Sequence, residues 1–319
     1  MKQKRKFQRN TYRNKRKFFV RLIICLIIIC LAAVISIPLV KFIKSKESAS
    51  ISIPDIYDEW NKRNYQSVYD MSSTLLQKKP QNNAALTFKG YSGFYLAVSE
   101  TDTVTAQELL DESINNLRIA LLSASPNVKP QIYYMLGKAY FYKNTLSSYH
   151  YYSDLAIKYL NYARLEGYEA DDIPEYLGLS YASLDMTQES IASFTEALIA
   201  RESDVLLLAI AEQYYKNKQM SAAKAYLYRI TTNTKDDKLR FKSSNLLGQI
   251  YLEEENYTDA QKEFETILQN DPNYADAYYG IGVIYEKQGD LAKARAEWRK
   301  ALRIDVNHQN SLKKLSEYK

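Results

Sequence analysis

The residues that could carry chemistry are few and widely separated. The chain has two histidines, His150 and His308, and two cysteines, Cys25 and Cys30. Neither histidine has a cysteine or a paired carboxylate at metal-ligand spacing, so we predict no metal site. Both cysteines fall inside one apolar run, where small apolar residues are expected. The rest of the chain has no cysteine with which to form a disulfide.

Phosphate binding and acid–base catalysis find no support in the sequence either. It contains no glycine-rich loop of the kind that cradles a phosphate group. Acidic runs such as Asp171-Asp172 and Glu253–Glu255 are expected at turns or on exposed faces, as solvated charge. We therefore predict no catalytic residue and no cofactor, and a protein that is not an enzyme.

Tyrosine is the residue type that stands out, with 29 copies among 319 residues. Tyrosine and phenylalanine offer a large contact area and have few rotatable bonds to immobilise, which suits a binding surface. The same rings also fill the cores between helices. Their role therefore depends on the elements that position them.

Those elements are helical hairpins that repeat along the chain. In Asn273–Asp305 the apolar residues recur at three and four residues on either side of a turn at Gln288–Asp290, which predicts two amphipathic helices. The preceding unit, Phe241–Pro272, has the same pattern. Four pairs of positions match at a spacing of 34 residues, namely Gly248 and Gly282, Tyr251 and Tyr285, Ala260 and Ala294, and Phe264 and Trp298.

A hairpin of about 34 residues, with small residues where its helices cross and an aromatic ring on the second helix, resembles the tetratricopeptide repeat (TPR). Weaker copies upstream centre on Gly90, Gly137, Gly178 and Ala211. Two of the steps between copies are long, which predicts lengthened helices or inserted loops near Val98–Thr105 and Lys143–Ser153. A first, partial repeat contributes its second helix around Val68, Leu75 and Leu76.

The resemblance implies an all-α solenoid, a right-handed superhelix of helical hairpins. About six to seven hairpins are expected within one repeat domain over residues 45–319. The best defined repeats are 241–272 and 275–306, and a capping helix is expected over 307–319, because the end of an array must shield its apolar face.

An apolar run near the N-terminus predicts a membrane anchor. Residues 22–40 carry no charge over 19 residues, which at about 1.5 Å per residue is close to the thickness of a bilayer core. Ten lysines and arginines precede the run and three follow it before the first acidic residue, Glu47. We predict a basic cytoplasmic tail at 1–21, a transmembrane anchor at 22–44 and an extracytoplasmic repeat domain, on the periplasmic or cell-surface side.

Three alternatives remain open for this region, and one is that the apolar run forms a buried helix of a soluble protein. The run could belong to a cleaved signal peptide, although its apolar core is long and no good cleavage site follows. The basic tail, with aromatic residues between its cations, could be a nucleic-acid arm, but contact with anionic lipid explains it more simply and no nucleic-acid partner is predicted. Residues 1–46 hold 13 of the 43 basic residues, so the remainder has 30 basic against 37 acidic residues and is itself acidic.

The resemblance also implies which side chains face the concave groove of the superhelix. They are Tyr91, Phe94, Tyr95, Tyr134, Lys138, Phe141, Tyr142, Tyr215, Asn245, Gln249 and Tyr279, with Glu286 in the last unit. The alternative is that inserted segments bury the aromatic residues of the first three units. No Lys/Asn pair recurs at the positions that clamp the terminal carboxylate of chaperone tails in some TPR proteins, so that ligand class is not implied.

These observations predict a membrane-tethered scaffold or adaptor that binds a protein or peptide in the groove. It resembles single-span TPR proteins of bacterial envelopes, which implies envelope assembly, secretion or chaperone-like work. A glycan-binding or small-molecule-binding module of the envelope is the alternative, because tyrosine-rich clefts can stack on sugars. An enzyme with an unrecognised carboxylate site is a third hypothesis.

Overall fold

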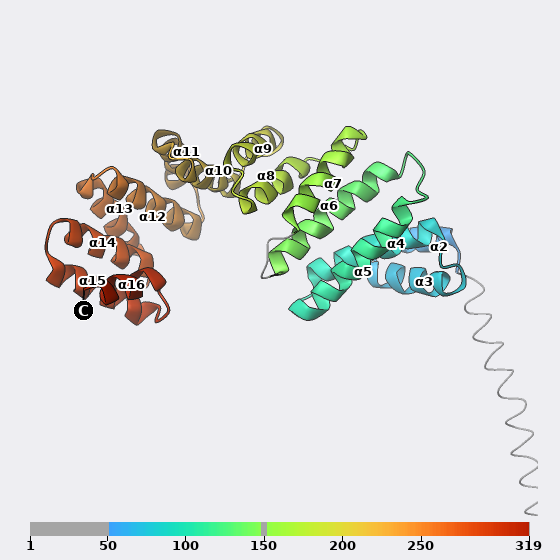
Figure 1. Ribbon diagram of the computed structural model, residues 1–319, viewed down its shortest axis with the longest axis horizontal. Coiled ribbons are helices and arrows are strands. Elements are labelled where there is room, and N and C mark those ends of the chain that lie inside the picture. Colours follow the sequence, from blue (N-terminus) through green and yellow to red (C-terminus); the bar gives the residue numbers. More distant parts are fainter. Residues whose placement is uncertain (1–50, 148–151, 319) are drawn as a thin grey trace, which may run out of the picture. The chain divides into compact units, whose positions relative to one another are not determined.

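The computed structural model describes residues 51–147 and 152–318, and all regular structure in these ranges is helical (Figure 1). The chain divides into two compact units, one ending at Leu96 and the other running from Ala97 to Lys319. The residues expected to form one repeat domain are therefore described as two units. The boundary falls inside α4 (Asn83–Ser99).

The first unit contains a complete hairpin where only one helix of a partial repeat was expected. Its helices are α2 (Ile53–Asn61) and α3 (Tyr65–Lys78). The Ser52 side chain caps α2 by accepting from the Asp55 amide, and the Ser52 amide donates a hydrogen bond to the Asp55 carboxylate at 2.8 Å, so two amides that the helix leaves free are both satisfied.

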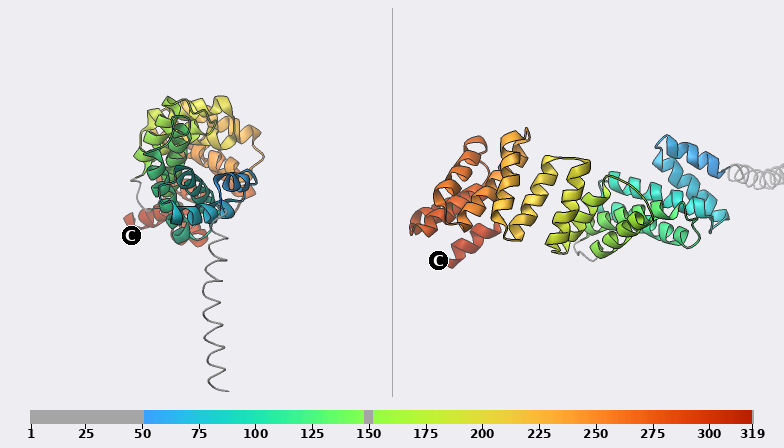
Figure 2. Two further views of the ribbon diagram at one scale, coloured as in Figure 1. Left: turned by 90° about the vertical axis from the view of Figure 1, so that its right-hand side faces the viewer. Right: turned by 90° about the horizontal axis from the view of Figure 1, so that it is seen from above.

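The second unit is a succession of antiparallel helix pairs, best seen in the right-hand view of Figure 2. Its helices after α4 are α5 (Thr103–Leu121), α6 (Lys129–Leu146), α7 (Ser153–Leu165), α8 (Ile173–Ser183), α9 (Thr187–Ala200), α10 (Asp204–Lys216), α11 (Met220–Asn233), α12 (Asp237–Glu253), α13 (Tyr257–Asn270), α14 (Ala275–Lys287), α15 (Leu291–Ile304) and α16 (Gln309–Glu317). The pairs are α6–α7, α8–α9, α10–α11, α12–α13 and α14–α15, and α16 packs on α15 as the expected cap.

Successive pairs meet mainly where the second helix of one pair packs on the first helix of the next, and several first helices also touch one another. Helix α6 contacts α8, α10 contacts α12, and α12 contacts α14, in addition to the contacts that each second helix makes with the first helix that follows it. The first helices of neighbouring pairs therefore form a common wall. The handedness of the superhelix stays a prediction.

Helix starts follow capping chemistry. The side chains of Ser203, Asn256 and Asp290 each accept a hydrogen bond from the backbone amide three residues further on, at 3.2, 3.3 and 3.0 Å, at the starts of α10, α13 and α15. The sequence thereby fixes where each helix begins, and with it the length of the turn before it.

The two long steps in the repeat correspond mainly to longer helices. Helices α4, α5 and α6 have 17, 19 and 18 residues, against 13 and 14 for α14 and α15. The extra residues expected near Val98–Thr105 lengthen α4 and α5. Those expected near Lys143–Ser153 extend α6 to Leu146 and continue into 148–151, which lie outside the described residues.

In four of the five pairs, all except α10–α11, a bulky side chain of the second helix lies over a glycine of the first. A Cβ atom added to Gly282 would lie 2.4 Å from the Trp298 indole nitrogen, and one added to Gly178 would lie 2.5 Å from the Phe194 ring. Leu160 takes the place of the ring opposite Gly137, at 2.6 Å. The missing Cβ atoms are what allow the helices to approach.

Phe264 of α13 joins two pairs. It is fully buried, and its ring lies against Gly248 of its own pair and against Gly280 of the next pair, where added Cβ atoms would come within 2.6 Å and 2.3 Å of it. Residue 280 had no assigned role in the repeat pattern. The structure shows that it must be small because the neighbouring pair's ring occupies the space beside it.

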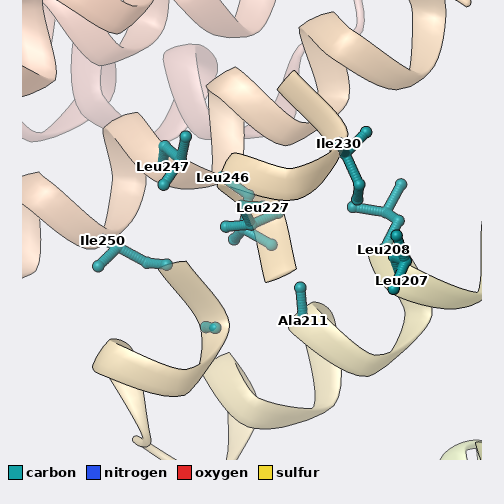
Figure 3. Packing of buried hydrophobic residues seen from close by; sticks show 9 residues of the cluster. Leu207, Leu208, Ala211, Leu227, Ile230, Leu246, Leu247 and Ile250 are labelled. Atoms are coloured by element: carbon teal, nitrogen blue, oxygen red, sulfur yellow. The ribbon is translucent and has the colours of Figure 1, made fainter. Parts of the chain in front are cut away.

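The buried residues between the α10–α11 pair and α12 are aliphatic. One cluster brings together Leu207, Leu208 and Ala211 of α10, Leu227 and Ile230 of α11, and Leu246, Leu247 and Ile250 of α12 (Figure 3). All are buried. Because three helices of two successive pairs contribute to it, neither pair covers this surface alone.

The predicted basic tail 1–21 and anchor 22–44 lie outside the described residues. From Ile51 onward, within the described ranges, none of the helices combines the length and apolar character needed to cross a bilayer. The anchor and its orientation stay sequence predictions.

The turns within the α8–α9, α10–α11, α12–α13 and α14–α15 pairs each contain one residue with a left-handed backbone. Gly289 has a φ of 84°, and the corresponding Asp185, Lys218 and Glu255 have φ of 55°, 58° and 60°. The turn predicted at Gln288–Asp290 is confirmed. Glycine adopts this conformation without steric cost, whereas a residue with a Cβ atom loses about 1–2 kcal/mol.

Replacing Glu255 with glycine should therefore stabilise the protein. We expect Glu255→Gly to raise the free energy of unfolding by about 0.5–1 kcal/mol, since the greater freedom of glycine in the unfolded chain offsets part of the gain. Urea unfolding of the full chain measures it. Glu254→Gly is the matched control. Glu254 has a φ of −81°, which suits any residue, so glycine there should lower the free energy of unfolding. A lower free energy of unfolding for Glu255→Gly would contradict the interpretation.

Gly280→Ala should destabilise the protein although alanine favours helices. Crowding against Phe264 is expected to lower the free energy of unfolding by about 1–3 kcal/mol, more than the gain of about 1 kcal/mol in helix propensity. Combining it with Phe264→Leu should make the effect of Gly280→Ala smaller or reverse it. Urea unfolding of the single and double variants gives the double-mutant cycle. Additive effects of the two changes would contradict crowding between residue 280 and the Phe264 ring.

Candidate functional site

The main group of predicted groove residues comes together on α6 and α8. We call it the α6–α8 cluster, and its members are Tyr134, Lys138, Phe141 and Tyr142 of α6, Tyr168 and Asp172 of the α7–α8 connection, and Tyr176 of α8. Several of its rings pack against the buried Leu160, Ile173 and Leu177, which fixes the cluster to the core.

Lys138 lies at the centre of the cluster. Its Nζ is 2.9 Å from Asp172 Oδ2 and 3.0 Å from the Tyr134 hydroxyl oxygen, and the Tyr134 hydroxyl donates to the Asp172 carboxylate at 2.8 Å. The same ammonium group lies over the rings of Tyr134 and Tyr176, at 5.0 and 4.9 Å from their centroids. The lysine charge is thus compensated by one carboxylate and two ring faces.

Aromatic rings continue the cluster on either side of Lys138. Tyr134 packs on Tyr168 with 4.8 Å between ring centroids, and Phe141 meets Tyr176 edge to face at 4.9 Å. The hydroxyl oxygens of Tyr142 and Tyr176 lie 3.4 Å apart. The result is a half-buried aromatic surface whose polar atoms are largely paired with one another.

The phenols of the cluster act as neutral groups. Burial raises the pKa of Tyr134, and its hydrogen bond to Asp172 raises the pKa further. Burial also raises the pKa of Tyr176, with a contribution from the hydrogen bond to Tyr142. Both hydroxyls stay protonated at neutral pH, so the arrangement suits contact and hydrogen bonding rather than proton transfer.

Tyr168 and Tyr176 were not among the groove residues predicted from the sequence, and the role of Asp172 was predicted wrongly. Asp172 was expected to be solvated charge, but it accepts hydrogen bonds from Tyr134 and Lys138. The repeat spacing contains the missing signal, because Asp172 follows Lys138 by 34 residues and Tyr176 follows Tyr142 by 34. Residues one repeat apart face each other across neighbouring first helices.

Tyr215 makes a similar link further along the wall. Its hydroxyl donates to the Glu253 carboxylate, which also pairs with Lys218 at 2.9 Å. The hydrogen bond from Tyr215 lowers the pKa of Glu253, and burial raises the pKa of Tyr215. Glu253 was expected to be solvated charge, and that interpretation is corrected here.

Asn245 and Gln249 lie on α12, and both are partly buried. The Asn245 Oδ1 atom is buried and has no hydrogen-bond partner among the described residues. Neither residue belongs to the α6–α8 cluster.

The last predicted groove residues are engaged by the capping helix. Tyr279 packs on His308 with 5.5 Å between ring centroids, and Glu286 binds Lys314 at 2.8 Å and also accepts from the Tyr318 hydroxyl. Burial opposes ionisation of Glu286, but hydrogen bonds from Lys314 and Tyr318 outweigh it and lower its pKa. This end of the wall is therefore covered by α16.

His308 serves the structure of that cap. Its Nδ1 accepts from the Ser311 backbone amide at 3.2 Å, so in the neutral ring Nε2 carries the proton and donates to Asp276 at 2.9 Å. Among the described residues, no group of three or more His, Cys, Asp and Glu side chains converges on a possible metal position.

The three predicted groove residues of the first unit pack internally. Phe94 and Tyr91 are only 2% and 8% exposed, and Tyr91 lies 5.7 Å from Trp60 between ring centroids. Tyr95 stacks on Tyr65 at 4.5 Å. Tyr91 and Phe94 are therefore buried, and the ring that packs on Tyr91 comes from the α2–α3 hairpin rather than from an inserted segment.

The raised pKa values of the cluster predict a loss of stability in alkali. A tyrosine whose pKa is raised on folding contributes fully below about pH 10, the ordinary tyrosine value, and its contribution is lost as the pH rises above that value. We expect the free energy of unfolding to fall between about pH 10 and pH 11, and to fall less in Tyr134→Phe. Urea unfolding at both pH values measures it. Tyr57→Phe, at a tyrosine that is 54% exposed, should match the unaltered protein. Equal slopes for all three would contradict the prediction.

Comparisons with known proteins agree with the repeat pattern. The tetratricopeptide repeat family model matches residues 245–306. A 67-residue stretch is 36% identical to the uncharacterized protein ycf37 of Pyropia yezoensis, covering 21% of this chain and 38% of that protein. The match therefore spans well under half of that relative's length.

Solved structures of repeat proteins share the fold. The C-terminal part of a TPR repeat-containing protein from Cytophaga hutchinsonii superposes with a TM-score of 0.58 at 14% identity, covering 82% of this chain and 98% of that one. The apo form of the quorum sensor NprR from B. thuringiensis gives 0.55 at 20% identity, covering 83% and 78%. At these identities the likeness concerns the fold alone.

The 34-residue period, the small residues beneath bulky side chains and the match over 245–306 agree with one another. Proteins of this kind bind protein or peptide partners. Residues 245–306 therefore match the tetratricopeptide repeat family, and the described part of the chain shares the fold of a solved TPR repeat-containing protein.

Proposed function

We propose that this protein is a membrane-tethered scaffold that binds a protein or peptide segment on the wall of first helices, at the α6–α8 cluster. The work it serves is envelope assembly, secretion or a chaperone-like task. The observation that carries the proposal is the half-buried aromatic surface around Lys138, anchored on the core and built from two successive first helices.

The cluster is organised before any partner arrives. Tyr134 and Lys138 are tied to Asp172, and Tyr142 is tied to Tyr176, so few side chains must be immobilised on binding. Pre-ordered aromatic side chains lower the entropic cost of association and supply most of the contact area. An extended segment could lie across the rings of α6 and α8, with apolar side chains on the rings.

The same hydrogen bonds argue against the glycan alternative. Sugar recognition needs polar groups available to the sugar hydroxyls as well as a ring to stack on. Here the hydroxyls of Tyr134, Tyr142 and Tyr176 are engaged with one another or with Asp172. A partner that contributes mainly apolar contacts fits this surface better.

The tether rests on the sequence of residues 22–40 and its flanking cations. Anchoring confines the repeats to a thin layer beside the bilayer, which raises their effective concentration toward other membrane proteins. A moderate affinity of the cluster would then suffice for a stable encounter.

Binding at the cluster predicts a separable mutant phenotype. With the full chain in lipid nanodiscs, extended peptides rich in apolar residues should bind, as measured by fluorescence anisotropy. Phe141→Ala and Tyr142→Ala should each weaken binding by about ten-fold, because each removes a ring of the surface. Tyr228→Ala on α11, a tyrosine that is 43% exposed, is the control. Unchanged affinity in both cluster variants would exclude this site.

The tether has its own test. Washing native membranes with alkaline carbonate should leave the protein in the pellet, and protease added to intact spheroplasts should digest the repeats. Protection of the repeats, or release into the supernatant, would overturn the membrane part of the proposal without touching the binding part.

A further inference from the structure

Exposed aliphatic side chains mark the ends of helices α5, α7 and α9. Leu122, Leu165 and Ile199 each follow, by two residues, a buried alanine of α5, α7 or α9, and they are 87%, 81% and 86% exposed. The residues at the same place on α11, α13 and α15 are Thr232, Gln269 and Arg303. An aliphatic residue is therefore no requirement of the repeat at this position.

Ile199 borders a cavity of about 490 Å³ between the α7–α8 connection and the end of α9. Its apolar lining also includes Tyr168, Ala170, Ile173, Pro174 and Ala200. Arg164 and Glu196, which also line it, are joined by an ion pair of 3.0 Å that ties α7 to α9. The cavity has room for a long aliphatic side chain.

Negative charge borders this cavity, because Glu169 and Asp171 line it and Glu166 immediately precedes the lining residue Gly167 in the chain. Glu166, Glu169 and Asp171 are exposed, and their carboxylates make no hydrogen bond or ion pair with any other part of the chain that the structure describes. The nearby arginines are already used, Arg164 by Glu196 and Arg201 by Glu175 at 3.0 Å. The surface therefore combines exposed aliphatic groups with uncompensated carboxylates.

This combination selects among the possible occupants. A second copy of the chain, docked through the same surface about a twofold axis, would bring the two sets of carboxylates together. A bilayer with anionic headgroups would repel them. A protein segment that carries cations beside its aliphatic side chains would satisfy both features.

We propose that Leu165, Glu166, Glu169, Asp171 and Ile199, here called the α7–α9 patch, bind a segment of a partner protein in which aliphatic side chains alternate with lysine or arginine. An aliphatic side chain enters the cavity beside Ile199, and the flanking cations meet the three carboxylates. The apolar contact supplies most of the affinity, and the exposed charges set orientation and choice of partner.

The α7–α9 patch is separate from the α6–α8 cluster in the residues that do the binding. Tyr168 borders both, since it packs on Tyr134 and lines the cavity. It is therefore left unchanged in the test. The proposal does not rest on binding at the cluster.

The test uses the full chain in phosphatidylcholine nanodiscs and three labelled peptides of equal length. One alternates leucine with lysine, one leucine with glutamate, and one serine with lysine. Fluorescence anisotropy should show binding of the leucine–lysine peptide alone, at least about ten-fold tighter than either of the others.

Variants then place the binding on the α7–α9 patch. Leu165→Ser with Ile199→Ser, and separately Glu169→Lys with Asp171→Lys, should each weaken binding of the leucine–lysine peptide by about ten-fold. All four side chains are exposed or border the solvent, so folding should survive, which circular dichroism checks. Gln269→Ser and Glu265→Lys on α13 are the matched controls and should change nothing.

Several outcomes would overturn the inference. They are equal binding of the glutamate peptide, no effect of either pair of changes, and loss of binding in Tyr142→Ala instead, which would assign the peptide to the cluster. If Leu165→Ser with Ile199→Ser dissociates a dimer in sedimentation, the occupant is a second copy. If it abolishes binding to anionic vesicles, the occupant is a lipid surface.

Discussion

The close approach of a bare glycine backbone to a bulky side chain holds this array together. Gly137, Gly178, Gly248 and Gly282 each lie beneath a large side chain of the partner helix, and in every case a Cβ atom would collide with it. Burial of such a side chain is favourable only if the two helices close over it. The crossing fixes how the first helix is rotated, and that rotation decides which of its residues face the wall.

The architecture could be predicted from the sequence because it depends on local, periodic signals. The match between Gly248 and Gly282, and between Phe264 and Trp298, locates two hairpins and the turn at Gly289 from the sequence alone. What the period could not show is contact between hairpins. The role of Gly280 depends on Phe264 of the preceding hairpin. The pattern within a single hairpin does not show which of its residues will contact the next hairpin.

The candidate site was predicted less completely than the fold. Tyr134, Lys138, Phe141 and Tyr142 were placed together because register fixes the faces of a helix. Their polar partner Asp172 was not predicted. A carboxylate in a connection between helices is expected to be solvated, and the sequence alone does not show that a lysine lies beside it. The first unit differs for another reason. Burial of Tyr91 depends on Trp60, and that ring comes from a hairpin whose first helix the pattern did not show.

For the partner binding proposed at the α6–α8 cluster, the ion pair inside it affects how a partner would arrive. Because Lys138 is already neutralised by Asp172 and by ring faces, this surface projects little electric field into the solvent. Encounter there proceeds without long-range steering, and dissolved salt has little to screen. Specificity at this surface would then depend on shape complementarity. Different partners would differ more in dissociation rate than in association rate.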